Sequence, residues 1–438
     1  MLYRIVTYGC QMNVHESEKL AGILELRGFL PAERDSDADV IVINTCCIRE
    51  NAENRILGNL GFVKKLKEEN RNLIVAVCGC MAQQDGAAER LKARCPFINI
   101  IFGTHNLAEF GAYLDKAMAG KKVSEVWPQE GEPAEGLPVK RGEGVNAWVN
   151  IMYGCDNFCT YCVVPYVRGR ERSRKSELVL DDIKRLLDEG FKEITLLGQN
   201  VNSYSGTDAD GNYVNFASLL EQAANVSAQK YRVRFTTSHP KDFSDEVIRV
   251  ISDSPNVPEF IHLPAQSGSD RILKAMNRKY TAADYLGRID AIKKLMPDAG
   301  ISGDIMVGFP GETEEDFLDT LRLVESVRYI NLFTFIYSKR RGTVAASMDN
   351  QIDRITALGR FQRLVNLQTS IGLELAAAAV GKTLEVLCDA YTAKTRLSRG
   401  KTASGKIIWF KSDTELTGQF VNVNVTHVKN SNLYGELI

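Results

Sequence analysis

The chain of 438 residues is long enough for two to four domains of about 100–200 residues each. Its hydrophobic content of 44% and charged content of 25% are ordinary for a water-soluble protein, and its formal net charge of −1 excludes a global electrostatic argument for nucleic-acid binding. No signal peptide is expected at the amino terminus and no apolar run is long enough to span a membrane. We therefore expect a cytoplasmic protein in which the clustering of several of the ten cysteines favours metal chemistry over disulfides.

The first 120 residues predict a parallel α/β sheet of the flavodoxin-like kind. Apolar strands alternate with helices, the strands over 4–8, 39–44, 73–77 and 98–102 and the helices over 16–27, 49–69, 85–94 and 107–119. Cys10, Cys46 and Cys80 each follow a predicted strand. Because the carboxyl ends of parallel strands meet at one edge, we expect these thiols to converge. Each could instead be a small buried residue, and spacing alone leaves Cys47 and Cys78 as alternative ligands.

Residues 121–146 carry three prolines and four glycines among charged residues and predict an inter-domain linker. From 147 to 375 the pattern predicts a partial (β/α)6 barrel, a truncated relative of the TIM barrel. Its six expected strands lie over 147–152, 193–197, 232–236, 260–263, 302–307 and 332–337. In such barrels the chemistry takes place at the carboxyl ends of the strands.

A cysteine-rich loop follows the first expected barrel strand. Cys155, Cys159 and Cys162 have the spacing C-x3-C-x2-C, and aromatic Tyr161 precedes the last of them. Three thiolates so close together suit three corners of a [4Fe-4S] cluster with one iron left open. The alternative is a zinc knuckle with a remote fourth ligand.

Polar and basic residues gather near the expected strand ends of the barrel. The candidates for cofactor contacts are Tyr161, Gln199, Ser238, Gln266 and Asp304, although each taken singly could be an ordinary turn residue. The segment 163–175 is expected to be irregular and basic, and with the turn at 337–343 it offers a phosphate clamp. Its candidate arginines are Arg168, Arg170, Arg172, Arg174 and Arg340, and a solvated charge run is the alternative.

Residues 376–438 predict a small all-β module. Strands are expected over 384–389, 406–410 and 419–425, with turns at 398–400 and 404–405. From Gly381 onward, eight Lys and Arg face five Asp and Glu, and aromatic residues accompany them. Basic side chains with aromatics on a small β-barrel suggest contact with RNA.

Six stretches carry a resemblance to a known family. They are YGCQMNVHESE at 8–18, NTCCIRENAENR at 44–55, CGCMAQ at 78–83, GCDNFCTYCVVPYVRGRERSR at 154–174, HLPAQSGSDRILKAMNRKYT at 262–281 and GDIMVGFPGETEEDF at 303–317. Together they resemble the radical S-adenosylmethionine (SAM) methylthiotransferases over nearly the whole chain. The resemblance implies a methylthiotransferase domain over 1–120, a radical SAM core over 147–375 and an RNA-binding TRAM domain over 376–438. One departure is Arg341, where the family commonly has proline.

The resemblance also implies the chemistry. All six motif cysteines would be catalytic, with Cys155, Cys159 and Cys162 holding the cluster that binds and cleaves SAM. Cys10, Cys46 and Cys80 would hold a second [4Fe-4S] cluster that carries the sulfur, so Cys47 and Cys78 would be non-ligands. The implied product is the 2-methylthio derivative of N6-isopentenyladenosine at position 37 of tRNA, beside the anticodon, made with two SAM molecules. The expected partners are the anticodon stem-loop, an electron donor such as flavodoxin or ferredoxin, and cluster-assembly or carrier proteins.

Two alternatives stay open at this stage. Other branches of the same family act on threonylcarbamoyl-adenosine in tRNA or on ribosomal protein S12. A different class would be an RNA-binding metalloprotein that performs no catalysis.

Overall fold

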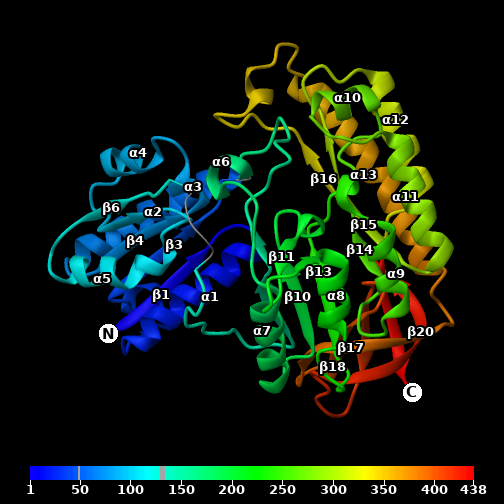
Figure 1. The fold of residues 1–438 in the computed structure, drawn as a ribbon, viewed down its shortest axis with the longest axis horizontal. Coiled ribbons are helices and arrows are strands. Elements are labelled where there is room, and N and C mark those ends of the chain that lie inside the picture. The colour runs from blue at the N-terminus through cyan, green and yellow to red at the C-terminus, as the bar shows by residue number, and fades with distance from the viewer. Residues whose placement is uncertain (48–49, 129–133) are drawn as a thin grey trace. The chain divides into compact units, whose positions relative to one another are not determined.

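The computed structural model describes residues 1–438 apart from 48–49 and 129–133, and for 50–54 it describes the backbone only (Figure 1). The chain forms two compact units. The first comprises 1–142, 152–158 and 162–173, and the second comprises 143–151, 159–161 and 174–438. Within the part that the structure describes, no helix has the length and apolar character to cross a membrane.

The first unit contains a six-stranded parallel sheet with the order β2-β1-β3-β4-β5-β6. Its strands are β1 (Leu2–Thr7), β2 (Leu30–Pro31), β3 (Val40–Thr45), β4 (Ile74–Gly79), β5 (Ile100–Phe102) and β6 (Val123–Glu125). The helices are α1 (Gln11–Leu26), α2 (Glu50–Glu69), α3 (Cys80–Gln83), α4 (Ala87–Arg94) and α5 (Phe110–Met118). The first five strands follow the flavodoxin-like order, so the expected parallel α/β fold is confirmed.

Separate hydrophobic cores fill the two faces of this sheet. One core joins strand residues to α1 and α5, and the other joins them to α2, α3 and α4. Strands β3 and β4 are buried throughout because helices cover both faces. This burial explains why their sequences are continuous apolar runs rather than alternating ones.

A segment that follows the cysteine-rich loop also belongs to the first unit. Helix α6 (Val164–Arg168) places Val167, together with Val163 just before it, in the core that contains α2, α3 and α4. Strand β9 (Arg172–Ser173) then pairs with β8 (Met152–Tyr153). The expectation of an irregular segment over 163–175 is therefore wrong, because two valines supply an apolar face that the basic composition obscures.

The second unit holds the six expected barrel strands in two parallel sheets. One sheet has the order β13-β10-β7 and the other β14-β15-β16. The strands are β7 (Asn146–Asn150), β10 (Glu193–Leu197), β13 (Arg232–Thr236), β14 (Phe260–His262), β15 (Gly300–Val307) and β16 (Asn331–Ile336). The helices between them are α7 (Ser176–Asp188), α8 (Phe216–Ala224), α9 (Asp245–Asp253), α10 (Asp270–Ala275), α11 (Ala282–Leu295) and α12 (Glu314–Val327). A hairpin of β11 (Ser205–Thr207) and β12 (Tyr213–Asn215) was not expected.

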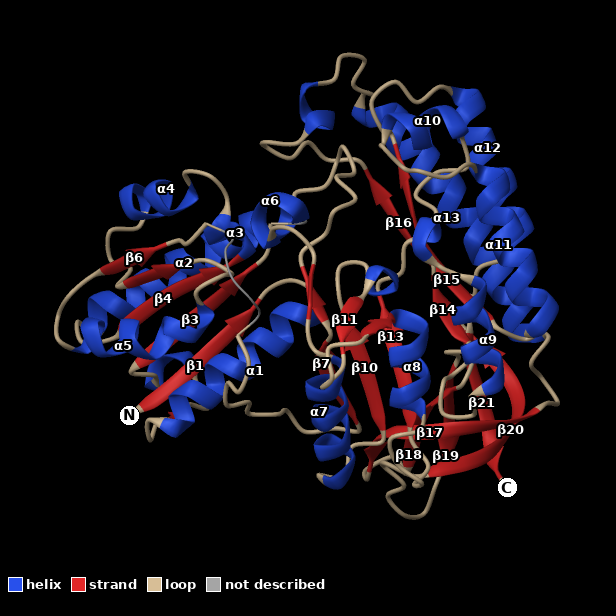
Figure 2. Cartoon of the chain, viewed as in Figure 1, coloured by secondary structure: helices blue, strands red, loops and turns tan. Residues whose placement is uncertain are grey.

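After the long helix α13 (Arg354–Ala377), the chain closes into a small barrel with the order β17-β18-β19-β21-β20 (Figure 2). Its strands are β17 (Thr383–Thr392), β18 (Leu397–Thr402), β19 (Ile407–Lys411), β20 (Phe420–Lys429) and β21 (Asn432–Leu437). The expected turn at 398–400 is wrong, because these residues lie inside β18. The buried positions of β18 are Ser398, Gly400 and Thr402, so the strand lacks the apolar alternation that would reveal it.

Candidate functional site

Three cysteine-bearing turns meet at the carboxyl edge of the first sheet. Cys10 is the N-cap of α1 after β1, Cys46 follows β3 directly, and Cys80 begins α3 after β4. Strand β3 lies between β1 and β4, so the three turns are neighbours. A Cβ atom added to Gly9 would lie 2.9 Å from the Cβ of Cys46. The structure thus brings these turns together, as the sheet topology predicted.

The two neighbouring cysteines differ in their surroundings. Cys78 lies in β4 and packs in the core with α1 and α5. Cys47 lies in the other core, together with Cys80. The Cys47 thiol lowers the pKa of Cys80, and Cys80 raises the pKa of Cys47. Cys47 is therefore a neighbour of Cys80, although the family pattern makes it a non-ligand.

Two asparagines join the three turns. Asn13, on the first turn of α1, accepts a hydrogen bond from the Cys10 thiol at 3.5 Å and donates to the carbonyl oxygen of Thr45 at 3.0 Å. Asn44, at the end of β3, donates to the carbonyl oxygen of Asn13 at 2.9 Å. Gly79 has a φ of +92°, and a side chain there would overlap Asn44 and Thr45. This close packing holds the three turns against one another.

A buried ion pair lies beside these thiols. The Arg168 guanidinium on α6 donates to both carboxylate oxygens of Glu16, at 2.5 and 3.2 Å, and to the Asn13 side-chain oxygen at 3.4 Å. Both charged side chains are at most 7% exposed. Burial raises the pKa of the Cys10 thiol, and the positive charge of Arg168 opposes that rise.

The cysteine-rich loop has hydrogen-bond donors directed at each of its sulfurs. The Asn157 amide lies 3.6 Å from Cys155 Sγ, the Val164 N–H lies 3.4 Å from Cys162 Sγ, and Arg278 Nη1 lies 3.4 Å from Cys159 Sγ. Such donors stabilise thiolate ligands and tune the potential of an iron–sulfur cluster. The sequence gives no local signal for this role of Arg278, because Cys159 lies 119 residues earlier.

The donors around the two cysteine groups suit iron–sulfur clusters. Among the described side chains, no group of three or more His, Cys, Asp or Glu residues is arranged to hold one ion. The ligands of a [4Fe-4S] cluster each bind a different iron, so they stand farther apart than the ligands of one ion. Thiol ligands, amide and guanidinium donors to sulfur, and burial therefore suit the two clusters that the sequence implies.

The polar residues expected at the barrel rim lie at the ends of their strands. Ser238, after β13, is 3% exposed, and its hydroxyl has no hydrogen-bond partner in the described part of the chain. The same holds for Asn200 Oδ1 after β10, beside the half-buried Gln199. Both oxygens are therefore available to a polar ligand at the strand ends.

Gln266 and Asp304 lie together at the next pair of strands. The Gln266 N–H donates to the Asp304 carbonyl oxygen at 2.8 Å, and Gln266 has a φ of +70°. The Asp304 carboxylate lies 3.6 Å from Nε2 of His262, whose pKa burial lowers to about 4. Tyr161 packs against the cluster of buried residues that contains Phe309.

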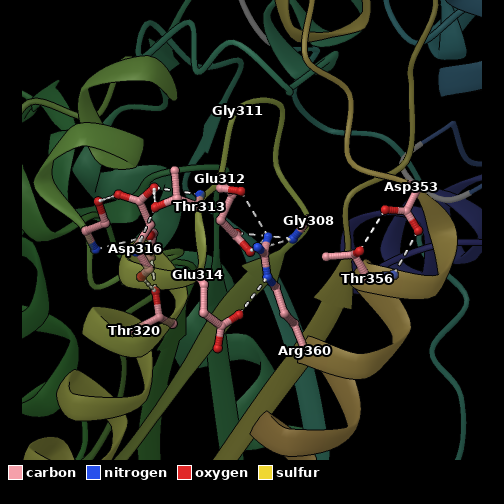
Figure 3. A network of polar contacts seen from close by, with 12 residues as sticks. Gly308, Gly311, Glu312, Thr313, Glu314, Asp316, Thr320, Asp353, Thr356 and Arg360 are labelled. Carbon is pink, nitrogen blue, oxygen red and sulfur yellow. Dashed lines mark hydrogen bonds and ion pairs between the residues drawn. The ribbon is translucent and has the colours of Figure 1, made fainter.

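The loop after β15 is held by a separate polar network (Figure 3). The Glu312 carboxylate accepts the Gly308 N–H at 3.1 Å and the Arg360 guanidinium at 2.9 Å. At the next helix start, Thr313 and Asp316 form a capping box on α12. These bonds fix the rim loop against α12 and α13.

The five arginines expected to contact RNA fall into two groups. Arg168 is 4% exposed and Arg174 is 8% exposed, and both form internal ion pairs, so they do not present a phosphate clamp at the surface. Arg170 is exposed and stacks 5.1 Å from the Phe158 ring. Arg172 is half-buried at 3.5 Å from His105, and Arg340 is half-buried in the turn that Thr343 closes.

Comparisons with known proteins agree with this architecture. Residues 149–324 match the radical SAM superfamily, and residues 2–103 match a family described as uncharacterized protein family UPF0004. A tRNA-2-methylthio-N(6)-dimethylallyladenosine synthase of Carboxydothermus hydrogenoformans is 49% identical over 100% of this chain and 99% of the relative. One from Caldicellulosiruptor saccharolyticus is 50% identical over 100% of this chain and 92% of the relative.

Among solved structures, the fold is similar to that of the radical SAM methyltransferase TsrM from Kitasatospora setae. The TM-score is 0.55 at 13% identity, over 79% of this chain and 73% of TsrM. The cobalamin-dependent SAM radical enzyme OxsB gives a TM-score of 0.51 at 15% identity, over 84% of this chain and 56% of OxsB. At these identities the likeness concerns the fold alone.

Proposed function

Because the chain belongs to the family of tRNA-2-methylthio-N(6)-dimethylallyladenosine synthases, we propose that it is a radical SAM tRNA methylthiotransferase. Its substrate is the N6-isopentenyladenosine at position 37 of tRNA, and its product carries a methylthio group at C2 of the adenine. The observation that carries the proposal is the presence of two separate groups of three cysteines. The group in the loop accounts for SAM binding, so the second group calls for a further role, which sulfur insertion supplies.

We assign the ligands from the two groups. Cys155, Cys159 and Cys162 hold the SAM-binding [4Fe-4S] cluster, and the second cluster rests on cysteines at the sheet edge, namely Cys10, Cys46 and Cys80. When bound, the first cluster and SAM supply a radical that removes a hydrogen from the adenine, and the second cluster supplies the sulfur.

The protein's own residues position these groups. Arg278, Asn157 and the Val164 N–H donate to the loop sulfurs and orient them as cluster ligands. Ser238 and Asn200 offer unsatisfied oxygens to the polar groups of SAM at the strand ends, where barrel enzymes bind their substrates. Tyr161, Gln199, Gln266 and Asp304 complete the proposed SAM contacts.

Contacts with tRNA are proposed for basic groups that reach the surface. Arg170 is exposed, and Arg172 and Arg340 are half-buried, so their charge can meet phosphate oxygens. The closed barrel over 383–437 would add backbone and stacking contacts, with His427 and Tyr434 stacked at 5.0 Å. The proposed protein partners are an electron donor such as flavodoxin or ferredoxin and a cluster-assembly or carrier protein.

The decisive experiment is an anaerobic assay with reconstituted full-length protein, SAM, a reductant and an isopentenylated anticodon stem-loop. We expect methylthio product from the wild type and none from Cys10→Ala. Cys95→Ala is the matched control, because Cys95 is a buried cysteine at the carboxyl end of α4 that belongs to neither group. Wild-type protein that binds one zinc ion and cleaves no SAM would contradict the proposal.

The substrate branch is tested separately. The nucleosides of a strain lacking this gene should lose the methylthio group of the isopentenyl form only. Loss from threonylcarbamoyl-adenosine, or from an aspartate of ribosomal protein S12, would instead place the chain in another branch of the family.

A further inference from the structure

Arg168 occupies an unusual position for a residue of a basic surface segment. It lies six residues after Cys162, yet its guanidinium is buried in the first unit against α1. Helix α6, which carries it, packs through Val163 and Val167 into the core of that unit. The chain that leaves the cysteine-rich loop is therefore anchored on the domain that holds Cys10, Cys46 and Cys80.

The contacts of Arg168 lead directly to those cysteines. Its guanidinium binds Glu16 with two hydrogen bonds and reaches the same Asn13 oxygen that accepts the Cys10 thiol. One buried cation thus contacts Asn13, which accepts a hydrogen bond from the Cys10 thiol and donates one to the Thr45 carbonyl oxygen, next to Cys46.

Stability alone does not explain the buried Arg168–Glu16 ion pair. Isolated from other groups, a buried pair often contributes no more stability than apolar side chains of the same volume, whereas loss of one partner is costly. Three thiolates on one cluster concentrate negative charge, which a nearby buried cation offsets. Glu16 holds the planar guanidinium in a fixed orientation through a bidentate contact.

We propose that Arg168 is a positioning residue for the second cluster. Its guanidinium holds the Cys10 turn through Asn13 and supplies a positive charge beside the thiolate ligands. Glu16 is the partner that orients it. This inference rests on the proposed function only in that a cluster binds at Cys10, Cys46 and Cys80.

The test isolates that cluster in the full-length chain. Cys155, Cys159 and Cys162 are replaced together by alanine, and the protein is reconstituted anaerobically so that about four iron atoms remain. The measurements are the rate of iron release to a chelator and the midpoint potential of the cluster. They are made in this background for Arg168→Gln, Arg168→Lys and Glu16→Gln. Arg141→Gln is the matched control, because Arg141 pairs with Glu18 on the same helix at 2.7 Å.

The midpoint potential is expected to shift in opposite directions in Arg168→Gln and Glu16→Gln. Arg168→Gln removes a positive charge, so the potential moves to more negative values and iron release becomes about tenfold faster. Glu16→Gln removes a negative charge, so the potential moves to more positive values. Arg168→Lys keeps the charge but loses the bidentate contact, so iron release is faster while the potential changes least.

If Arg168 had a merely structural role, the midpoint potentials of Arg168→Gln and Glu16→Gln would shift in the same direction or would both equal that of Arg141→Gln. Either result overturns the inference. If Arg168→Gln does not fold, the positive shift of Glu16→Gln alone decides the question. The proposed function fails in a different way, when wild-type protein binds no second cluster and the background variant retains no iron.

Discussion

The two groups of three cysteines are assembled in different ways. The loop group lies within eight residues of sequence, from Cys155 to Cys162, and its spacing alone defines it. The sheet-edge group lies on three turns about 35 residues apart, and only the order of the parallel strands brings them together. A local site depends on its loop conformation, whereas the sheet-edge site depends on the register and packing of a whole domain. A substitution that damages one group of cysteines should therefore leave the other group able to bind iron.

The largest effect is expected from the ligands themselves. Cys159→Ala should abolish cleavage of SAM, because the loop group alone binds it. Cys10→Ala should keep SAM cleavage but abolish methylthio product. Each variant should retain about four of about eight iron atoms. Iron content, 5′-deoxyadenosine and methylthio product are measured on the same samples, and equal loss of SAM cleavage in both variants would contradict the division of roles.

Two glycine substitutions test the supports rather than the ligands. Gly79→Ala introduces a Cβ that overlaps Asn44 and Thr45 at a φ of +92°, so the sheet-edge site should lose most of its iron. Gly154→Ala overlaps the Arg170 carbonyl at a φ of +77°, so the loop site should lose its iron instead. Gly120→Ala is the control, with a φ of +80° and no heavy atom near its added Cβ. Each clash costs roughly 2–4 kcal/mol of stability. Spectra that show the same cluster lost in both site variants would refute this assignment.

Arg278→Gln should have an intermediate effect on the loop site. It removes a buried cation that donates to Cys159 Sγ at 3.4 Å, and loss of such a support typically costs ten- to one-hundred-fold in metal affinity or activity. SAM cleavage should fall by at least about tenfold, while the iron at the sheet-edge site stays in place. Lys279→Gln changes the exposed neighbouring charge and should leave both sites unchanged. Equal effects of the two variants would show that the hydrogen bond to sulfur is unimportant.

The sequence was informative where a pattern is local. Strands β10 and β13 begin and end at the residues that the apolar runs indicated, and the cysteines at the strand ends were found from topology. The failures concern partners distant in sequence. Arg168 was read as a surface charge because Glu16, 152 residues earlier, gives no local signal. Residues 398–400 in β18 were expected to form a turn because the buried positions of that strand are small or polar.

The smallest effect is expected from a residue that touches neither cysteine group. Burial alone would raise the pKa of Asp316, but hydrogen bonds from Arg271, Ser269 and Thr313 lower it to about 2 from its usual 3.8. A carboxylate whose pKa is lowered on folding contributes stability above its unfolded pKa and loses it as the pH falls through the folded value. The contribution, about 1–2 kcal/mol at neutral pH, should therefore disappear between about pH 4 and pH 2.

Asp316→Asn should lower the melting temperature by a few degrees at pH 7, lose this difference near pH 2, and leave the iron content of both sites unchanged. Asp253→Asn, on an exposed helix end, is the control. Melting curves of the reconstituted protein across this pH range measure the effect. A loss of iron from Asp316→Asn would mean that the capping network of α12 also supports the loop cysteines. The loop site would then depend on distant packing as well, as the sheet-edge site does.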